Sequence, residues 1–538
     1  MTTSLIRSVD TASAVPMTPF STNAARQSSP FWALTVVILV YALLGAQVIE
    51  RPGLYMDEIN PDYLAVRMVN PSVPTAAWII PGNYFFDRFP LMDGGLYHGS
   101  LHAYLAVPFY LIFGGTILSI RIGHMFLAIL ILIAAFTLLR AATLPTKIST
   151  FALLLLATDP AFIFAFRTPA DSTTFPICLV MVGLSILISH RSLRAHVVAG
   201  TTLGFAFWCY FTFVLFLPGV LVWIFMNRNG WRPAAALLVG SAIGASPYAV
   251  GYAFLFHDMG WQPAVSWLRQ AFDGLHVGTG QSYGARVGSV LQAAWSAVTS
   301  QWHREYFWGA QQVGYVQAAK ATTLIAAPIA ALPFARSDFA AFRLLALATV
   351  SFLISATLFG GRMGGYHFNP LVPLLYVLAA MSVTILTNRF SGASFASVAV
   401  ATASAVLVVN VVSTERVMIA LKNRGAIGLY SDVISNYPKM ALSRGDRTAH
   451  VFLDWGAMFQ FIYLTEGLIP TYDHTTPLTA ILCRHGLVKI ISLGDGAAER
   501  TANALQGREA DSIEIVRDPQ SQFIYRVTTI KRHSNDCK

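Results

Sequence analysis

The chain has 538 residues, of which 55% are hydrophobic and only 12% are charged, and its mean hydropathy is +0.57. This composition excludes a string of soluble domains and predicts a mainly α-helical, polytopic membrane protein. The formal net charge of +10 arises mostly in short gaps between apolar runs, and no basic run carries interleaved aromatic residues, which excludes nucleic acid as a partner.

Residues 1–30 are polar and rich in Ser and Thr, and no clear small-residue cleavage site follows them, so we expect a disordered cytoplasmic tail. A transmembrane module with about 11 helices is expected over 31–413. Its apolar stretches begin near residues 31, 122, 148, 173, 197, 210, 234, 316, 344, 370 and 393.

The basic residues of the short loops predict the orientation. If the N-terminus is cytoplasmic, nine of them fall in loops on the cytoplasmic side and two in loops on the other side. The nine are Arg140, Lys147, Arg191, Arg194, Arg228, Arg232, Arg336, Arg343 and Arg389, and the two are Arg167 and Arg362. This distribution follows the positive-inside rule and supports the helix count.

Two long segments are expected on the outer side. The first, 50–121, is too long for a simple connector and contains a short helix at 61–69 and an apolar helix near 98–113. We expect the apolar helix to lie in the membrane interface, because a crossing there would invert every later loop and spoil the charge distribution. The second segment, 257–315, is rich in Trp, Gln, Gly and Tyr and is expected to form a folded cap.

From residue 414 to 538 the charge rises, and period-two runs at 450–453, 488–492 and 512–516 alternate with helical stretches. This pattern predicts a small α/β domain outside the membrane, on the periplasmic side. Two of the four cysteines, Cys483 and Cys537, fall in this domain and could pair in an oxidising compartment. The cysteines show no metal-ligand spacing.

An acidic pair, Asp57 and Glu58, follows the first apolar stretch at the edge of the membrane. Carboxylates are costly to bury near lipid, so acids at this border are candidates for function. The alternative is a helix start, because Asn60 and Pro61 suit an N-cap and a first helical position that nearby acids favour.

Further polar residues are expected at the same outer level: Arg121, Asp159, Arg167, Asp171, Arg362, His367 and Asn369. Each has a plain alternative. Arg121 could extend to lipid head groups, and Arg167 and Asp171 could form a surface ion pair. Asp159 before Pro160 could cap a helix break, and His367 could be an interfacial histidine beside a helix-starting proline. Convergence of acids and bases from separate segments at one depth nevertheless indicates a site.

These groups suit the transfer of a sugar from a lipid-linked donor. A carboxylate can deprotonate an acceptor hydroxyl or amine as it attacks the anomeric carbon, while Arg and His neutralise a departing phosphate. The candidates for binding this phosphate are Arg121, Arg362, His367 and Arg167. Asp57 is the predicted base. Neighbouring residues of an extended loop point to opposite sides, so Glu58 is expected to orient the loop or to bind the acceptor.

The order of these features resembles the GT-C class of integral membrane glycosyltransferases, especially the branch with protein O-mannosyltransferases and lipid A aminoarabinose transferases. The resemblance covers roughly residues 31–413. Its matching pieces are Asp57-Glu58, an interfacial helix ending at Phe113-Gly114-Gly115, Arg121, the set Pro160, Arg167 and Asp171, and the segment from Arg362 to Pro373 with His367 and Pro370. The two prolines common at the start of the family's interfacial helix are absent from 97–101, so a different local backbone is expected there.

The resemblance implies a polyprenyl-phosphate-linked sugar donor, with Asp57 as the base, Asp171 as a second acidic position, and Arg121 and Arg362 as phosphate ligands. We therefore expect an inverting glycosyltransferase of a bacterial inner membrane that transfers a hexose or pentose to a glycan, lipid or protein on the periplasmic side. No cofactor is required by the sequence, although the carboxylates could hold a divalent cation. The alternative is a transporter or flippase of lipid-linked saccharides, but such proteins place ionisable groups nearer the bilayer midplane.

Overall fold

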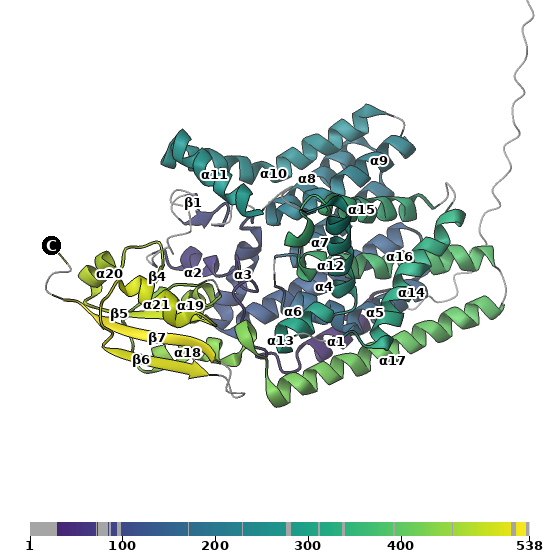
Figure 1. The fold of residues 1–538 in the computed structure, drawn as a ribbon. Coiled ribbons are helices and arrows are strands. Elements are labelled where there is room, and N and C mark those ends of the chain that lie inside the picture. The colour runs from purple at the N-terminus through teal and green to yellow at the C-terminus, as the bar shows by residue number, and fades with distance from the viewer. Residues whose placement is uncertain are drawn as a thin grey trace, which may run out of the picture.

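Helices dominate the structure, a computed structural model, and a β-sheet lies at its C-terminal end (Figure 1). The described residues are 30–71, 73, 84–85, 88–93, 98–170, 172–228, 230–275, 281–309, 312–335, 339–390, 393–454, 456–517, 523–533 and 537. The predicted mainly α-helical class is confirmed.

Every one of the eleven apolar stretches forms a helix. They are α1 (Pro30–Gly45), α4 (Ile117–Ala141), α5 (Thr146–Thr158) with α6 (Pro160–Arg167), α7 (Thr174–Ser189), α8 (Leu193–Cys209), η1 (Phe211–Phe216) with α9 (Leu217–Arg228), α10 (Trp231–Met259), α14 (Tyr315–Ala331) with η2 (Leu332–Phe334), α15 (Ala340–Ala356), α16 (Leu371–Arg389) and α17 (Ala393–Arg424). Five of these regions, at α4, α10, α14, α16 and α17, are long and apolar enough to cross a membrane, and the bent pair α5–α6 would make six. The predicted number of 11 crossings is therefore not confirmed.

A bend of 65° separates α5 from α6. Pro160 takes the first position of α6, where its missing N–H is tolerated, and the Asp159 side chain caps the helix by accepting from the Ala161 N–H over 2.8 Å. Lys320 Nζ and the Tyr376 hydroxyl each donate to the same carboxylate over 2.7 Å. Asp159, which the sequence suggested as a site residue, thus belongs to a buried network that fixes this bend.

Helices α8 and α10 approach each other closely because four glycines line their contact. These are Gly200 and Gly204 on α8 and Gly240 and Gly244 on α10. A Cβ atom at any of the four would lie 2.1–2.2 Å from a backbone carbonyl oxygen of the other helix. Small residues spaced four apart allow such close packing between helices in a membrane.

The first outer segment contains both of its predicted helices. They are α2 (Leu64–Val69) and α3 (Leu101–Phe113), with the short strands β1 (Tyr84–Phe85) and β2 (Phe89–Pro90) between them. The second outer segment is mainly helical in its described part, as α11 (Trp261–Leu275), α12 (Tyr283–Val298) and α13 (Gln301–Trp308). Two short 3-10 helices, η4 (Gly360–Arg362) and η5 (Gly365–Phe368), precede α16.

The residues after α17 form a five-stranded sheet with helices. Its elements are η6 (Gly428–Tyr430), α18 (Asp432–Ser443), β3 (Ala449–Phe452), α19 (Met458–Leu464), β4 (Thr471–Asp473), α20 (Leu478–His485), β5 (Leu487–Leu493), α21 (Ala497–Leu505), β6 (Ser512–Arg517) and β7 (Phe523–Lys531). The strand order is β4-β3-β5-β7-β6, with β3 parallel to β4 and β5, and β7 antiparallel to β5 and β6. The boundary predicted at residue 414 lies inside α17, which continues to Arg424.

One apolar core joins this sheet region to the first outer segment. Side chains of α2 and α3 share a buried cluster with those of α18, α19, β5 and β7. Figure 1 accordingly shows α2 and α3 between the sheet and the other helices. The C-terminal region therefore packs directly on the segment that carries the acidic pair.

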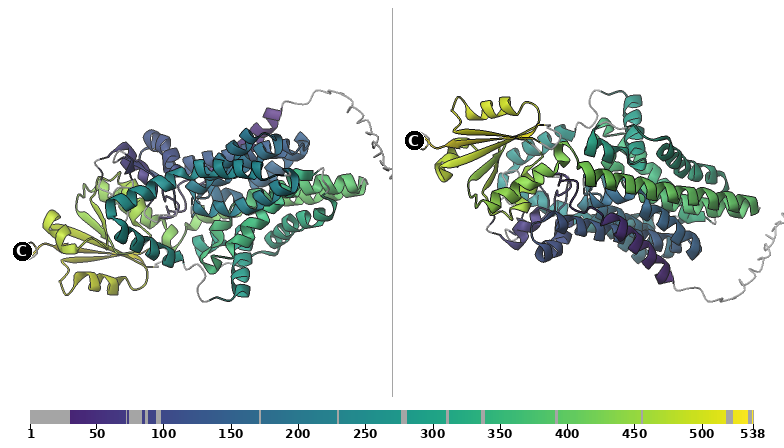
Figure 2. Two further views of the ribbon diagram at one scale, coloured as in Figure 1. Left: turned by 90° about the horizontal axis from the view of Figure 1, so that it is seen from above. Right: turned by 90° about the horizontal axis from the view of Figure 1, so that it is seen from below.

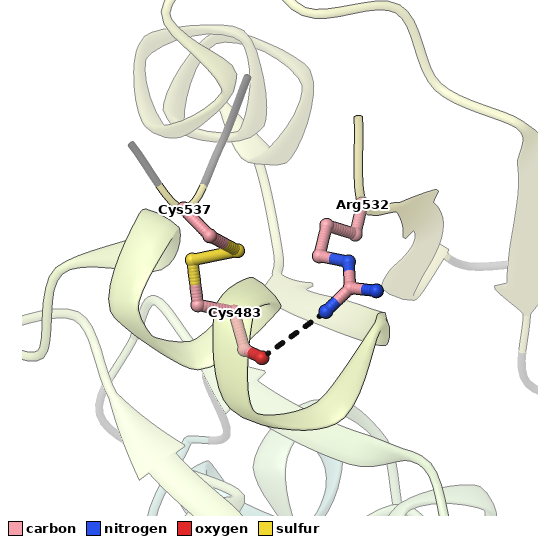
Figure 3. The surroundings of a disulfide bond; sticks show 3 residues. All are labelled: Cys483, Arg532 and Cys537. Atoms are coloured by element: carbon pink, nitrogen blue, oxygen red, sulfur yellow. Dashed lines mark hydrogen bonds between the residues drawn. A yellow bond between two sulfur atoms is a disulfide. The ribbon is translucent and has the colours of Figure 1, made fainter. Parts of the chain in front are cut away.

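Cys483 of α20 and Cys537 are joined by a disulfide bond, with their Cα atoms 5.4 Å apart (Figure 3). Arg532 donates a hydrogen bond of 3.4 Å to the backbone oxygen of Cys483. Cys178 and Cys209 are unpaired and buried. Disulfides persist in oxidising compartments, which agrees with the outer location predicted for this region.

Candidate functional site

Glu58 and Arg121 form a fully buried ion pair at the start of α4. Arg121 Nε donates to Glu58 Oε1 over 2.9 Å, and its Nη2 donates to Oε2 over 3.3 Å. Arg121 also donates to the backbone oxygens of Ile49 (2.8 Å) and Gly53 (3.4 Å). Such two-pronged contacts give direction as well as energy, so Arg121 anchors the acidic segment on α4.

Arg167, at the end of α6, holds the same stretch of chain from a second side. It is fully buried and donates to the backbone oxygens of Gly45, Gln47 and Arg51 over 3.1, 2.8 and 2.5 Å. The sequence suggested a phosphate ligand or a surface ion pair at this position. The contacts of Arg167 support a third role, in which it fixes the turn between α1 and the acidic pair.

Asp57 keeps partial exposure, whereas its neighbour Glu58 is buried. The Tyr55 phenol donates a hydrogen bond to Asp57, and burial together with the Asp57 charge raises the pKa of that phenol far above its usual range. The ring of Tyr430 lies 4.9 Å from that of Tyr55. Burial raises the pKa of Tyr430 as well, and the charges of Glu58 and Asp57 add to this effect. The two acids therefore differ in environment, and Asp57 is the one that keeps contact with solvent.

A row of aromatic rings leads from the acidic segment to His367. Ring centroids are 6.0 Å apart from Tyr55 to Tyr306, 6.2 Å from Tyr306 to Tyr366, and 4.2 Å from Tyr366 to His367. His367 also stacks on Tyr210 at 6.1 Å. Tyr306 is 36% exposed, so this row offers ring faces and hydroxyl groups to a ligand beside the acidic segment.

His98 connects the first outer segment to this row. Its ring stacks on Tyr210 at 4.7 Å, and the two residues form an antiparallel bridge. Burial lowers the pKa of His98 to about 3, and the charge of His367 contributes to the lowering, which places these two rings near each other. The first outer segment, η1 and η5 therefore meet at one place.

Arg362, at the end of η4, is exposed. No hydrogen bond or ion pair joins it to the acidic pair within the part of the chain that the structure describes. A second guanidinium lies on the neighbouring element, because Arg286 of α12 packs against η4: a Cβ atom at Gly360 would lie 3.0 Å from Arg286 Cγ. The sequence did not single out Arg286, since no motif surrounds it in the cap segment.

Asp171 lies outside the described residues. Its neighbour Ser172 donates a hydrogen bond of 2.7 Å to the backbone oxygen of Asn60. The chain directly after Asp171 thus contacts the acidic segment two residues beyond Glu58.

A third group of ionisable side chains was not predicted from the sequence. Asp62 lies between two imidazoles: His102 Nδ1 is 2.5 Å from Asp62 Oδ1, and His124 Nε2 is 2.8 Å from Asp62 Oδ2. All three side chains are buried, and their ligand-type atoms lie within 4.8 Å of one another. His124 follows Arg121 by one turn of α4, a spacing that would have signalled a shared helix face.

Residues 97–250, less than a third of the chain, match the family profile described as dolichyl-phosphate-mannose-protein mannosyltransferase. No curated protein sequence matches the chain.

Two solved structures of ArnT from Cupriavidus metallidurans resemble the structure over nearly all of its length. The one bound to undecaprenyl phosphate has a TM-score of 0.55 at 11% identity, covering 92% of this chain and 97% of that one. The apo state has a TM-score of 0.52 at 13% identity, with the same two coverages. The chain has the GT-C fold. The fold that the resemblance implied is thereby confirmed.

The oligosaccharyltransferase of Archaeoglobus fulgidus matches at a TM-score of 0.48 and 11% identity, covering 92% of this chain and 72% of that one. The family match begins just before α3 and ends inside α10, so it includes Arg121 and Arg167 but neither Asp57 nor Arg362. The GT-C fold therefore accounts for the helical scaffold, while the roles of individual residues rest on the contacts described above.

Proposed function

We propose that this protein is an inverting membrane glycosyltransferase that moves a sugar from a polyprenyl-phosphate donor to an acceptor at the outer face of a bacterial inner membrane. The observation that carries this proposal is the half-buried Asp57 carboxylate beside a fully satisfied Glu58–Arg121 pair. The GT-C fold and the mannosyltransferase family profile support glycosyl transfer. The ArnT structure with undecaprenyl phosphate supports a donor of the same chemical kind.

In the proposed reaction Asp57 accepts the proton of an acceptor hydroxyl or amine as the oxygen or nitrogen attacks the anomeric carbon. The bond between that carbon and the phosphate oxygen breaks, and the polyprenyl phosphate leaves with the bonding electrons. Attack from the face opposite the leaving group inverts the anomeric centre. Glu58 acts as a positioning residue, because Arg121 already occupies both of its oxygens.

The donor phosphate requires a positive group near the outer surface. Arg362 is exposed and Arg286 packs against the same element, so we assign the phosphate to these two. Arg121 is buried against Glu58 and backbone oxygens, and Arg167 is buried against the backbone oxygens of the turn after α1, so we assign both to holding the acidic segment. The row from Tyr55 to His367 would then face the sugar.

Glu58 is a poor cation ligand, because both of its carboxylate oxygens already accept hydrogen bonds from Arg121. Of the acidic pair, only Asp57 remains as a possible cation ligand among the described residues, and our proposed steps use no cation. The acceptor, whether glycan, lipid or protein, would enter from the side of the outer segments and the C-terminal sheet.

The test uses the full-length protein in lipid nanodiscs with radiolabelled polyprenyl-phosphate sugars and a membrane extract. We expect label to enter an extract component, and Asp57→Asn to lower kcat by about 100-fold or more because a general base contributes that much. Arg362→Ala should mainly raise the KM for the donor. Asp495→Asn, an exposed acid in the C-terminal region, is the matched control and should transfer normally.

Near-normal turnover in Asp57→Asn would refute the assignment of the base. Movement of the labelled lipid across the bilayer with no transfer from any donor would instead support a flippase.

A further inference from the structure

The cluster of Asp62, His102 and His124 takes no part in the proposed reaction. Its members come from three separate elements: the chain just before α2, the first turn of α3, and α4. Each is at most 3% exposed. Their surroundings are apolar, since side chains of α2, α3 and the start of α4 belong to one buried hydrophobic cluster.

Asp62 differs from two other buried acids, Glu58 and Asp159, in how its charge is balanced. Glu58 is paired with Arg121, and Asp159 is paired with Lys320. Asp62 has no Arg or Lys partner among the described residues; it contacts only the two imidazoles. Buried carboxylates are normally balanced by a cation, so either a ring is protonated or a metal ion supplies the charge.

We propose that Asp62, His102 and His124 bind one zinc-like transition-metal ion that joins the first outer segment to α3 and α4. Two imidazole nitrogens and one carboxylate oxygen are a donor set that zinc prefers, and the two nitrogens argue against magnesium or calcium. A fourth position is left for water or another small ligand.

The geometry requires only a small adjustment for an ion to enter. Ligand atoms about 2.0–2.2 Å from a tetrahedral zinc ion lie roughly 3.3 Å from one another. The present separations of 2.5 and 2.8 Å therefore open by less than about 1 Å when the carboxylate turns toward the ion. His102 Nε2 and His124 Nδ1 have no hydrogen-bond partner in the described structure, so no outer contact fixes which nitrogen of either ring carries the proton.

The position of the cluster gives the ion a structural role. Asp62 follows Glu58 by four residues, and His124 follows Arg121 by three, so the two contacts lie side by side along α4. His102 adds the start of α3. An ion at this site would fix the segment that carries Asp57 against two helices at once.

The experiment measures metal in the full-length protein after removal of any affinity tag and desalting into metal-free buffer. We expect about one zinc ion per chain, removable by a chelator with a drop in melting temperature that added Zn²⁺ reverses. Replacement by Co²⁺ should give the visible absorption bands of a tetrahedral site. His102→Gln and His124→Gln should lose the ion, whereas His196→Gln, a buried histidine of α8 whose Nδ1 contacts the Ser192 carbonyl, should keep it.

If a variant fails to fold, the zinc content of the wild-type protein and its response to added metal still test the proposal. A wild-type protein with no bound zinc, and with no response of melting temperature or absorbance to chelator, Zn²⁺ or Co²⁺, would show that the cluster is a hydrogen-bonded contact only. Loss of the ion in Asp57→Asn together with its retention in His124→Gln would also overturn the proposal, because the ion would then lie at the acidic pair. These measurements need no sugar transfer, so their outcome is separate from that of the proposed function.

Discussion

The adjacent acids Asp57 and Glu58 differ in burial and in their partners. Glu58 is buried and neutralised by Arg121, while Asp57 stays half-buried beside Tyr55. A charge buried in apolar surroundings is tolerated when its partner is in place, but becomes very costly when the partner is lost. The Glu58–Arg121 pair should therefore matter for stability more than for the chemistry itself.

We predict that Arg121→Met lowers the free energy of unfolding by about 3–5 kcal/mol, because it leaves an unpaired buried carboxylate. The double variant Glu58→Leu with Arg121→Met should regain most of that loss, since neither charge of the pair is left buried without its partner. Denaturation of both variants in the same detergent measures the difference. Arg447→Met, at an exposed position, is the control and should change little. A double variant as unstable as Arg121→Met alone would contradict the ion-pair interpretation.

The sequence predicted which residues are candidates but not how they pair. Asp57, Glu58, Arg121 and Arg167 do come together. Their contacts were not predictable, because Glu58 and Arg121 are 63 positions apart and a phosphate ligand fits an arginine equally well. Asp62 was overlooked because an acid after Pro61 is typical of a helix start.

At the scale of elements, the sequence pattern predicted three of the five C-terminal strands. The period-two runs correctly located β3, β5 and β6. β4 has only three residues, too few for a pattern. β7 lies between β5 and β6 and carries pairs of adjacent buried residues, such as Ile524 with Tyr525, which breaks the alternation.

His450 of β3 makes the stability of this sheet depend on pH. Its ring is buried, accepts a 2.8 Å hydrogen bond from the Tyr437 hydroxyl at Nε2 and donates one of 2.8 Å from Nδ1 to the Thr448 oxygen. Burial lowers the pKa of His450 from 6.5 to about 4. The unfolded chain therefore binds a proton at a higher pH than the folded one, so acid favours unfolding.

We predict that the free energy of unfolding falls by about 1.4 kcal/mol per pH unit between pH 6.5 and 4 from this group, and by roughly 3 kcal/mol in total. Above pH 6.5 the ring is neutral in both states and contributes no slope. His450→Gln should remove this part of the pH dependence, while His474→Gln, at an exposed position nearby, should retain it. Denaturation followed over this pH range tests the idea, and an unchanged slope in His450→Gln would contradict it.

At the scale of the whole molecule, helix length limits what the sequence could predict. Hydropathy located all eleven apolar helices, but α1 and α7 have 16 residues each and reach about 24 Å, less than the roughly 30 Å core of a bilayer. The bend at Asp159 likewise divides one apolar run into two short helices. An average of hydropathy along the sequence detects the apolar run but not the bend. The number of crossings therefore cannot be counted from hydropathy alone.

The number of membrane crossings decides on which side of the membrane each end of the chain lies. Both views of Figure 2 show α1 beginning near the end of the helical part that lies away from the C-terminal sheet. The long helix α17 runs from that far end back toward the sheet. An odd number of crossings, whether five or eleven, places the two ends of the chain on opposite sides of a membrane, whereas six would place them on the same side.

We predict opposite sides, with the C-terminal sheet outside and the loop between α4 and α5 inside, because nine basic residues lie in loops of one side and two in loops of the other. Single cysteines at Lys147 and Asp495, both exposed, report on the two places. A membrane-impermeant maleimide added to intact spheroplasts should label Asp495→Cys at once and Lys147→Cys only after permeabilisation. The parental protein gives the background, since Cys178 and Cys209 are buried and Cys483 is bonded to Cys537. Labelling of both cysteines in intact spheroplasts would require an even number of crossings between the loop after α4 and the C-terminal sheet. The five crossings at α4, α10, α14, α16 and α17 alone would give this result, because four of them follow that loop.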